Sequence, residues 1–164
     1  MTDANPKNPV THPGNPSVIV RIPTPIWLIG MIVLALLIGE LLELPAVLRH
    51  RPVGIVVLVA GFLWSAWAFL TFRQHRAEIR PASTEHPAFV TSGPFRWSRN
   101  PMYLGSLGVA VGAALISGTG LMWLVPVVLF LLQNFVIIPF EERSMQRTFG
   151  EEYDAYRARV RRWI

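Results

Sequence analysis

Two short stretches of this chain carry the residue types that could do chemistry, one around Asn100 and one at Glu141-Glu142. The first stretch, residues 91–105, combines two arginines, several aromatic side chains and an Asn-Pro pair. Asn is a favoured N-cap residue and Pro is favoured at the first helical position, so a helix is expected to begin at Pro101. The free N–H groups of a helix N-terminus suit a carboxylate or phosphate, although the same pattern also serves as an ordinary helix start.

The second stretch, Glu141-Glu142, could hold a cationic ligand or could be a pair of solvated charges at the end of a helix. Other chemistries find little support. The absence of cysteine excludes disulfides, thiolate metal sites and cysteine nucleophiles. The four histidines show no spacing suited to a metal, so no metal site is expected; they are His12, His50, His75 and His86.

The composition predicts that membrane-spanning helices carry these stretches. The chain has 164 residues, 52% hydrophobic and 15% charged, whereas soluble domains carry about 25% charged residues. Residues 22–39, 52–72 and 100–140 contain no Asp, Glu, Lys or Arg. A span needs about 20 apolar residues, so the longest run holds two spans. We therefore predict an all-α integral membrane protein with four transmembrane helices, at about residues 26–42, 53–72, 101–116 and 121–139, and exclude a soluble globule.

The third and fourth predicted spans are separated only by Ser117-Gly118-Thr119-Gly120, a turn signal. Such a short turn makes the two helices antiparallel neighbours. The start of one and the end of the other must then lie close, which places Asn100–Tyr103 and Glu141-Glu142 in one pocket. Gly105, Gly108 and Gly112 are spaced as small residues are where helix backbones pack closely.

The remaining segments flank this membrane domain, which is expected to cover residues 26–164. Residues 1–25 hold six prolines and are predicted to be a disordered tail. Residues 140–164 are predicted to form an amphipathic helix on the cytoplasmic side, with apolar residues at helical spacing. That helix could lie on the membrane surface or pack as a lid on the helix ends. Its apolar stripe is Met145, Phe149, Tyr153, Tyr156, Val160 and Trp163.

The basic residues set the expected orientation. With four spans, 13 of the 15 Lys and Arg residues fall on the side that holds both termini and residues 73–99. The positive-inside rule places that side in the cytoplasm, so we expect a multi-pass protein of the cytoplasmic membrane with both termini cytoplasmic. The net charge of +5 is then explained by arginines facing membrane lipids rather than by nucleic-acid binding. The pattern defines no oligomeric state.

An ordered set of residues runs through the second half of the chain. It comprises Ser92-Gly93-Pro94-Phe95, then Arg99-Asn100-Pro101-Met102-Tyr103-Leu104-Gly105, Glu141-Glu142, and Phe149-Gly150-Glu151-Glu152-Tyr153 with Tyr156 and Val160. Over about residues 87–162 this set resembles the isoprenylcysteine carboxyl methyltransferase family and the related membrane phospholipid N-methyltransferases. The resemblance implies a membrane methyltransferase that binds S-adenosylmethionine on the cytoplasmic side, between the last two spans and the C-terminal helix.

By position, the resemblance implies donor contacts from Pro87, Ala88, Phe89, Val90, Phe95, Asn100, Pro101, Met102, Tyr103 and Glu141. Phe95 stands where the prenylcysteine enzymes have tyrosine, and Asn100 where they have histidine. Ile137 stands where the eukaryotic prenylcysteine enzymes carry a substrate-contacting arginine. The sequence Asn-Pro-Met-Tyr resembles the phospholipid enzymes instead. The lipophilic acceptor thus stays open between a phospholipid amine and a prenylcysteine-like carboxylate.

Methyl transfer from a sulfonium needs no metal and depends mainly on holding the reacting atoms in line. Glu141 could pair with the donor's amino group, and Tyr103 and Phe95 could flank its adenine or sulfonium. Arg99 or Arg96 could hold an anionic acceptor, and Glu142 is the candidate general base.

The alternative is a non-catalytic four-helix membrane scaffold or assembly protein whose Arg-rich face binds anionic lipid. It accounts for the spans but not for the ordered set.

Overall fold

The computed structural model describes residues 23–77 and 89–164, and this part of the chain is helical. Pro87, Ala88 and the first 22 residues of the predicted tail lie outside the described residues. A 3₁₀ turn (η1) precedes α4, and a π-helical turn (η2) joins α5 to α6. The elements are α2 (Thr24–Leu41), α3 (Arg51–Ala77), η1 (Gly93–Arg96), α4 (Pro101–Ser117), α5 (Gly120–Leu132), η2 (Gln133–Ile137), α6 (Ile138–Phe149) and α7 (Glu151–Arg159).

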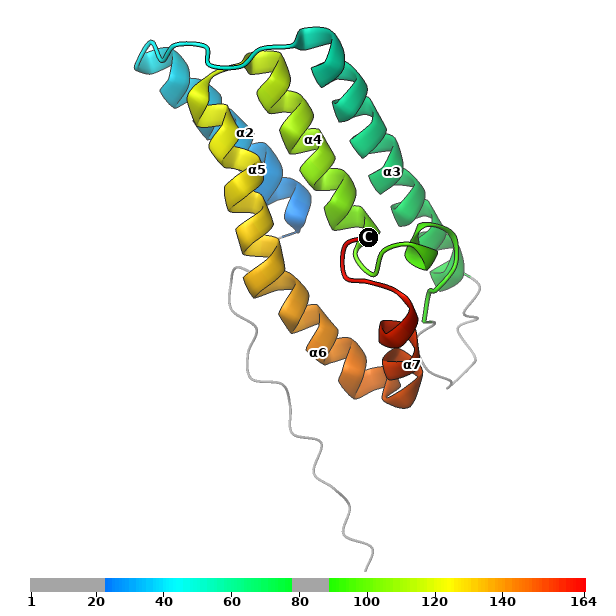
Figure 1. Cartoon of the computed structure of the whole chain (residues 1–164). Helices are drawn as coiled ribbons and strands as arrows, with labels where there is room; N and C mark the ends of the chain where they lie inside the picture. Colours follow the sequence, from blue (N-terminus) through cyan, green and yellow to red (C-terminus); the bar gives the residue numbers. More distant parts are fainter. Residues whose placement is uncertain (1–22, 78–88) are drawn as a thin grey trace, which may run out of the picture.

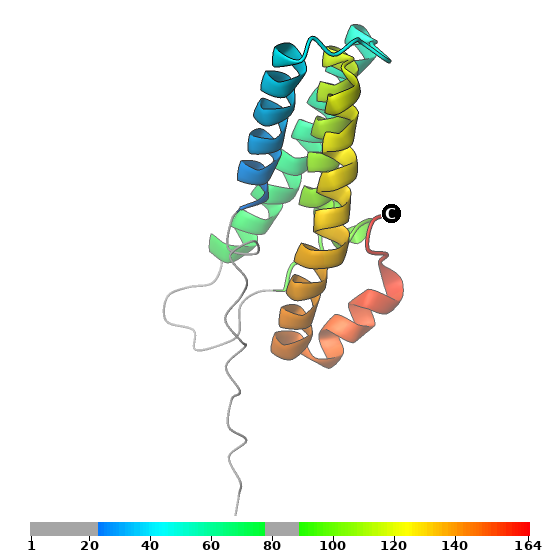
Figure 2. The same ribbon diagram turned by 90° about the vertical axis from the view of Figure 1, so that its left-hand side faces the viewer.

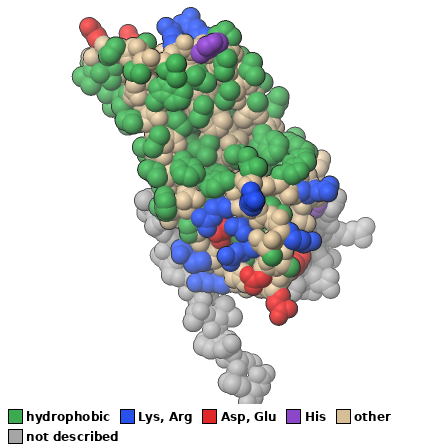
Figure 3. All heavy atoms as spheres, viewed as in Figure 1, with side chains coloured by type: hydrophobic (Ala, Val, Ile, Leu, Met, Phe, Trp, Pro, Cys, Tyr) green, Lys and Arg blue, Asp and Glu red, His purple; other side chains and the backbone are tan. Residues whose placement is uncertain are grey.

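The described residues include three helices that are long and apolar enough to cross a membrane, and one shorter apolar helix. The long ones are α2, α3 and the continuous helix Gly120–Phe149, and the shorter one is α4, with 17 residues. Large apolar side chains face outward, as at Leu37 and Val56, which are 64% and 67% exposed. Figure 3 shows this apolar surface over most of the bundle, with arginines gathered at the end near α7. The predicted class, an all-α integral membrane protein, is confirmed.

The helices run side by side, and α4 lies between α3 and α5 (Figure 1). The connection from α2 to α3 and the turn from α4 to α5 share one end of the bundle, while α6, α7 and the last residues lie at the other. The view turned by 90° shows α7 and the last residues folding back alongside the long helix (Figure 2). The start of α4 therefore lies at the same end as α6 and α7.

Glycines let α3 and α4 approach until their backbones touch. A Cβ atom added at Gly61 would lie 2.7 Å from the carbonyl oxygen of Gly105, and one added at Gly112 would lie 2.7 Å from that of Gly54. Small residues at such spacing allow this approach in membranes. The expected packing role of Gly105, Gly108 and Gly112 is thus observed, and it fixes the position of α4 against α3.

The tight hairpin of the last two spans is also observed. Gly118 ends α4 in the left-handed conformation, with φ 79°, and its N–H donates to the carbonyl of Ala114 at 2.8 Å. The carbonyl of Gly118 accepts from Val47 N–H at 2.7 Å, so the preceding connection lies against the turn. A β-branched or larger residue at Gly118 would be strained by both the backbone angle and the nearby Arg49 Cβ.

The helix boundary expected at residue 140 lies elsewhere. The fourth span continues without a break into α6, and this long helix ends at Gly150, whose φ is 50°. The expected helix of residues 140–164 is therefore two pieces: the end of a long helix and the separate α7. Glu141 is the first charged residue because the helix leaves the apolar layer there. A helix can continue beyond that layer, so the first charge does not mark the end of the helix. The π-helical turn before Pro139 accommodates the proline, which has no N–H for the regular ladder.

We expect Gly112→Val to destabilise the protein by about 1–3 kcal/mol, because its side chain would overlap Leu58 and the Gly54 carbonyl of α3. The matched control is Gly30→Val on α2, where an added Cβ meets nothing within 4 Å. Thermal unfolding in detergent should show a lower melting temperature for the first variant alone. Equal melting temperatures would contradict the proposed packing.

Candidate functional site

The start of α4 and the start of α6 meet through two side chains. The hydroxyl of Tyr103 donates to Oε1 of Glu141 at 2.5 Å. Thr24, at the start of α2, lies beside the same hydroxyl. The structure thus brings together the two stretches that carry chemistry, across 38 residues of sequence.

Glu142 forms ion pairs with two arginines on either side of it. Arg99 Nη2 lies 2.9 Å from Glu142 Oε1, and Arg162 Nη2 lies 2.5 Å from Glu142 Oε2. Arg162 Nε donates a further bond to Oε1 at 3.2 Å. The side chains of Arg99 and Glu142 are only 12% and 13% exposed. Both carboxylate oxygens of Glu142 therefore already accept hydrogen bonds from guanidinium groups.

The first turn of α4 begins at Asn100-Pro101 as predicted, but the Asn100 side chain does not cap it. Pro101 occupies the start of the helix, and no side-chain hydrogen bond caps this end. Asn100 Nδ2 donates instead to the carbonyl of Arg162 at 3.0 Å, and Asn100 N–H donates to Ser98 Oγ at 3.0 Å. The first turn of α4, which lies beside the Tyr103–Glu141 contact, consequently has no side-chain cap.

The other residues implied as donor contacts lie in two apolar clusters. Val90 and Phe95 are buried together with Ala68, and Met102 packs against them. Phe89 stacks on Phe149 of α6 with ring centroids 4.9 Å apart and meets Tyr156 edge-on at 5.1 Å. Val90 and Phe95 are thus packed between α3 and the start of α4, and Phe89 is packed against α6 and α7.

The helix α7 packs as a lid on the loop before α4. Tyr156 is 4% exposed and its hydroxyl donates to the carbonyl of Phe95 at 2.7 Å. Burial raises the pKa of Tyr156 above its ordinary value of 10.0, and burial also raises that of Tyr153. Both phenols therefore stay protonated at neutral pH. Of the two expected arrangements for this segment, α7 takes the packed one.

Four further residues connect the site, and the sequence analysis singled out none of them: Ser106, Gln133, Asn134 and Arg162. Gln133, fully buried, donates to Ser106 Oγ at 2.8 Å, and Ser106 donates to the carbonyl of Tyr103 at 2.7 Å. Asn134 Oδ1 accepts from Trp163 Nε1 at 3.1 Å and from Arg162 Nη1 at 3.4 Å. Two adjacent amides inside a charge-free span were the available signal, because such side chains commonly hydrogen-bond between helices.

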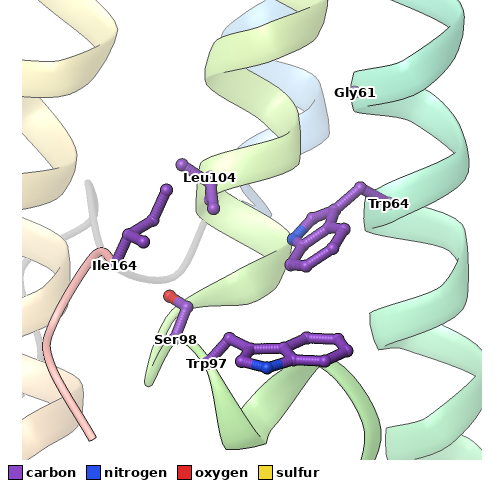
Figure 4. A pocket seen from close by; sticks show the side chains of 6 residues that line it. All are labelled: Gly61, Trp64, Trp97, Ser98, Leu104 and Ile164. Carbon is purple, nitrogen blue, oxygen red and sulfur yellow. The ribbon is translucent and has the colours of Figure 1, made fainter.

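An apolar cavity of about 600 Å³ adjoins the site (Figure 4). Trp64 and Trp97 extend along one side of it, and Leu104 and Ile164 lie on the other. Leu104 follows Tyr103 on α4, and Ser98 of the lining accepts the Asn100 N–H bond. The cavity thus shares a wall with the polar site. Within residues 23–77 and 89–164, no group of His, Cys, Asp and Glu residues could hold a metal ion.

The fold and the site together define a helical membrane protein whose polar site lies at one end of its apolar bundle. Residues 50–152 match the phospholipid methyltransferase family, more than half of the chain, so the protein belongs to that family of membrane methyltransferases. The family indicated by the residues around Asn100 and Glu141 is thereby confirmed.

The chain is also 36% identical over 63 residues to an uncharacterized protein of Haemophilus influenzae. The matched stretch is 38% of this chain and the whole of that relative. No solved structure matches the chain.

We expect Tyr156→Phe to lower stability by about 1–3 kcal/mol, because it leaves the buried carbonyl of Phe95 without its donor. Below pH 10 the wild type holds this bond in full. Because burial raises the folded-state pKa of Tyr156 above 10, the stability that the bond gives the wild type is lost as the pH rises above 10 and through the folded-state pKa. Chemical denaturation at pH 7 and above pH 10 measures both effects.

Tyr153→Phe is the matched control, because the Tyr153 hydroxyl makes no hydrogen bond to any of the described residues. A loss at neutral pH as large as that of Tyr156→Phe would contradict the assigned contact.

Proposed function

We propose that this protein transfers a methyl group from S-adenosylmethionine to a lipophilic acceptor at the cytoplasmic face of the membrane. The observation that carries the proposal is the contact of Tyr103 with Glu141 beside the uncapped start of α4. This juxtaposition offers a carboxylate for an ammonium group and free N–H groups for a carboxylate, the two charged groups of an amino acid. The residues present therefore fit the amino-acid end of that donor.

S-adenosylmethionine supplies an electrophilic methyl group on a sulfonium, and the protein mainly binds and orients. In this proposal Glu141 holds the donor's amino group and the first turn of α4 receives its carboxylate. The ring of Tyr103 would flank the donor's adenine or sulfonium, since aromatic faces attract cations. Phe89, Val90 and Phe95, which pack in apolar clusters before α4, are proposed donor contacts on the family resemblance. Pro87 and Ala88 remain proposed donor contacts on the resemblance alone.

The acceptor is proposed to reach the site from the lipid. The cavity beside Ser98 and Leu104 is walled by apolar side chains, which suits the chain of a lipid-like molecule. Asn100-Pro101-Met102-Tyr103 and the family match favour a phospholipid amine over a prenylcysteine-like carboxylate. Orientation with both termini in the cytoplasm remains the proposal from the positive-inside rule.

Glu142 is the proposed base for an amine acceptor, with a constraint set by its ion pairs. Both of its oxygens accept from Arg99 or Arg162, so taking a proton requires one guanidinium to move away. Arg99, freed in the same movement, could then hold the phosphate of the acceptor. The non-catalytic scaffold, the alternative function, makes no use of this arrangement.

We expect Glu141→Gln to raise the Kd for S-adenosylmethionine by at least about tenfold, because it removes the charge that pairs with the donor's ammonium. Calorimetry on the full chain in detergent measures this, with Glu151→Gln as an exposed acidic control on α7. Unchanged affinity in Glu141→Gln would disprove the pocket. A wild type whose melting temperature does not respond to S-adenosylmethionine would favour the scaffold.

We expect Leu104→Trp to raise the KM for a long-chain acceptor several-fold with little change in the Kd for the donor, because the larger side chain fills the apolar cavity. Incubation with methyl-labelled donor and a total lipid extract first identifies the labelled product. Leu63→Trp is the control, since Leu63 faces outward from α3 and is 60% exposed. Equal KM values for both variants would exclude this cavity as the acceptor's route.

A further inference from the structure

The chain after α7 returns to the start of α4 as a non-helical strap, residues 160–164. Val160 ends α7 with extended backbone angles, φ −119° and ψ 129°. The strap then runs back toward α4 at the end of the bundle opposite the hairpin turn (Figure 1). None of its residues belongs to the expected donor site.

The backbone of the strap pairs with the residues just before α4. Arg99 N–H donates to the carbonyl of Arg161 at 3.0 Å. The next carbonyl, that of Arg162, accepts from Asn100 Nδ2 at 3.0 Å and from Ser98 Oγ at 3.3 Å. The strap is thus the partner that the Asn100 side chain takes in place of its own helix.

Side chains anchor the strap to the long helix on the other side. Arg162 pairs with Glu142, and Trp163 Nε1 donates to Asn134 in the π-helical turn at 3.1 Å. The ring of Trp163 also lies against Phe130, with centroids 5.3 Å apart. The strap therefore spans the gap between the start of α4 and the helix that carries Glu141.

The Asn100 amide has two polar atoms: Nδ2 donates to the strap, and Oδ1, the atom that would cap α4, makes no capping bond in this orientation. As an N-cap, Asn bonds the second or third N–H of its helix, here that of Met102 or Tyr103. Bonded to Arg162, it leaves those N–H groups uncapped. Those are the groups that the proposed function assigns to the donor's carboxylate.

We propose that Arg162 and Trp163 are positioning residues: by seating the strap, they draw Asn100 away from its own helix and keep the first turn of α4 open to an anionic group. The binding part of this inference rests on the proposed function. The competition for Asn100 does not, because it depends only on contacts within the chain. A weakened strap should let Asn100 cap α4 and compete with the ligand.

The first experiment tests the competition without any ligand. Hydrogen–deuterium exchange over residues 98–104 should show greater protection of the Met102 and Tyr103 amides in Arg162→Gln and Trp163→Phe than in the wild type. Trp163→Phe keeps an aromatic ring at this position beside Phe130 and removes the N–H donor. Arg161→Gln is the matched control, because its side chain is exposed. Unchanged or lower protection in both strap variants would overturn the proposal.

The second experiment measures the consequence for binding. Calorimetry should give a Kd for S-adenosylmethionine about tenfold higher in Arg162→Gln and Trp163→Phe, with Arg161→Gln within about twofold of the wild type. Arg162→Lys, which keeps a charge for Glu142, should recover most of the affinity. In an Asn100→Ala background, which cannot cap, Trp163→Phe should have an effect below about twofold.

An equal loss in both backgrounds would overturn the proposal, since the strap would then act without Asn100. If the wild type itself fails to bind S-adenosylmethionine, the proposed function fails, and the exchange experiment still decides the role of the strap.

Discussion

At Gly61 and Gly108 the backbones of α3 and α4 lie in direct contact, since neither residue carries a side chain that would hold the helices apart. In a bilayer, apolar side chains gain nothing by leaving lipid for each other, so close van der Waals packing has to hold helices together. The contact continues toward the site, where Ser65 donates to the carbonyl of Met102 at 3.0 Å. The start of α4, and with it Asn100 and Tyr103, is therefore positioned by packing within the apolar layer.

The opposite wall of the site depends on one irregular turn in the longest helix. The π-helical turn η2 precedes Pro139, and its wide geometry places two adjacent amides on different partners. Gln133 faces α4 and bonds Ser106, while Asn134 faces Arg162 and Trp163. Buried polar side chains need such partners, because lipid offers none. One turn thus connects the long helix to both the first turn of α4 and the strap, and the same helix continues to Glu141 and Glu142.

The sequence predicts those parts that follow from local rules or from chain length. Charge-free runs define the spans, and a turn of four residues forces Asn100 and Glu141 to the same end of adjacent helices. Prediction from the sequence fails where a residue distant in the chain competes with a local preference. Asn100 is a good N-cap by type, yet the carbonyl of Arg162, 62 residues later, takes its side chain. The first charge, Glu141, predicts the end of the fourth span, whereas the helix itself ends at Gly150, whose φ is positive. Partners of Glu142 such as Arg162 follow only from the folded structure.

The location of the site at the edge of the apolar layer is itself a chemical requirement of the proposed reaction. A donor with an ammonium, a carboxylate and a sulfonium dissolves in water, and the cost of moving such charges into lipid is many kcal/mol. A long-chain acceptor has the opposite preference. The two can meet without either leaving its solvent only where an apolar cavity adjoins a polar site. Trp64 and Leu104 line such a cavity, and Tyr103, Glu141 and the uncapped end of α4 lie directly beyond it. Charges at this end cannot lie unpaired beside lipid, which explains why Glu142 forms ion pairs with both Arg99 and Arg162.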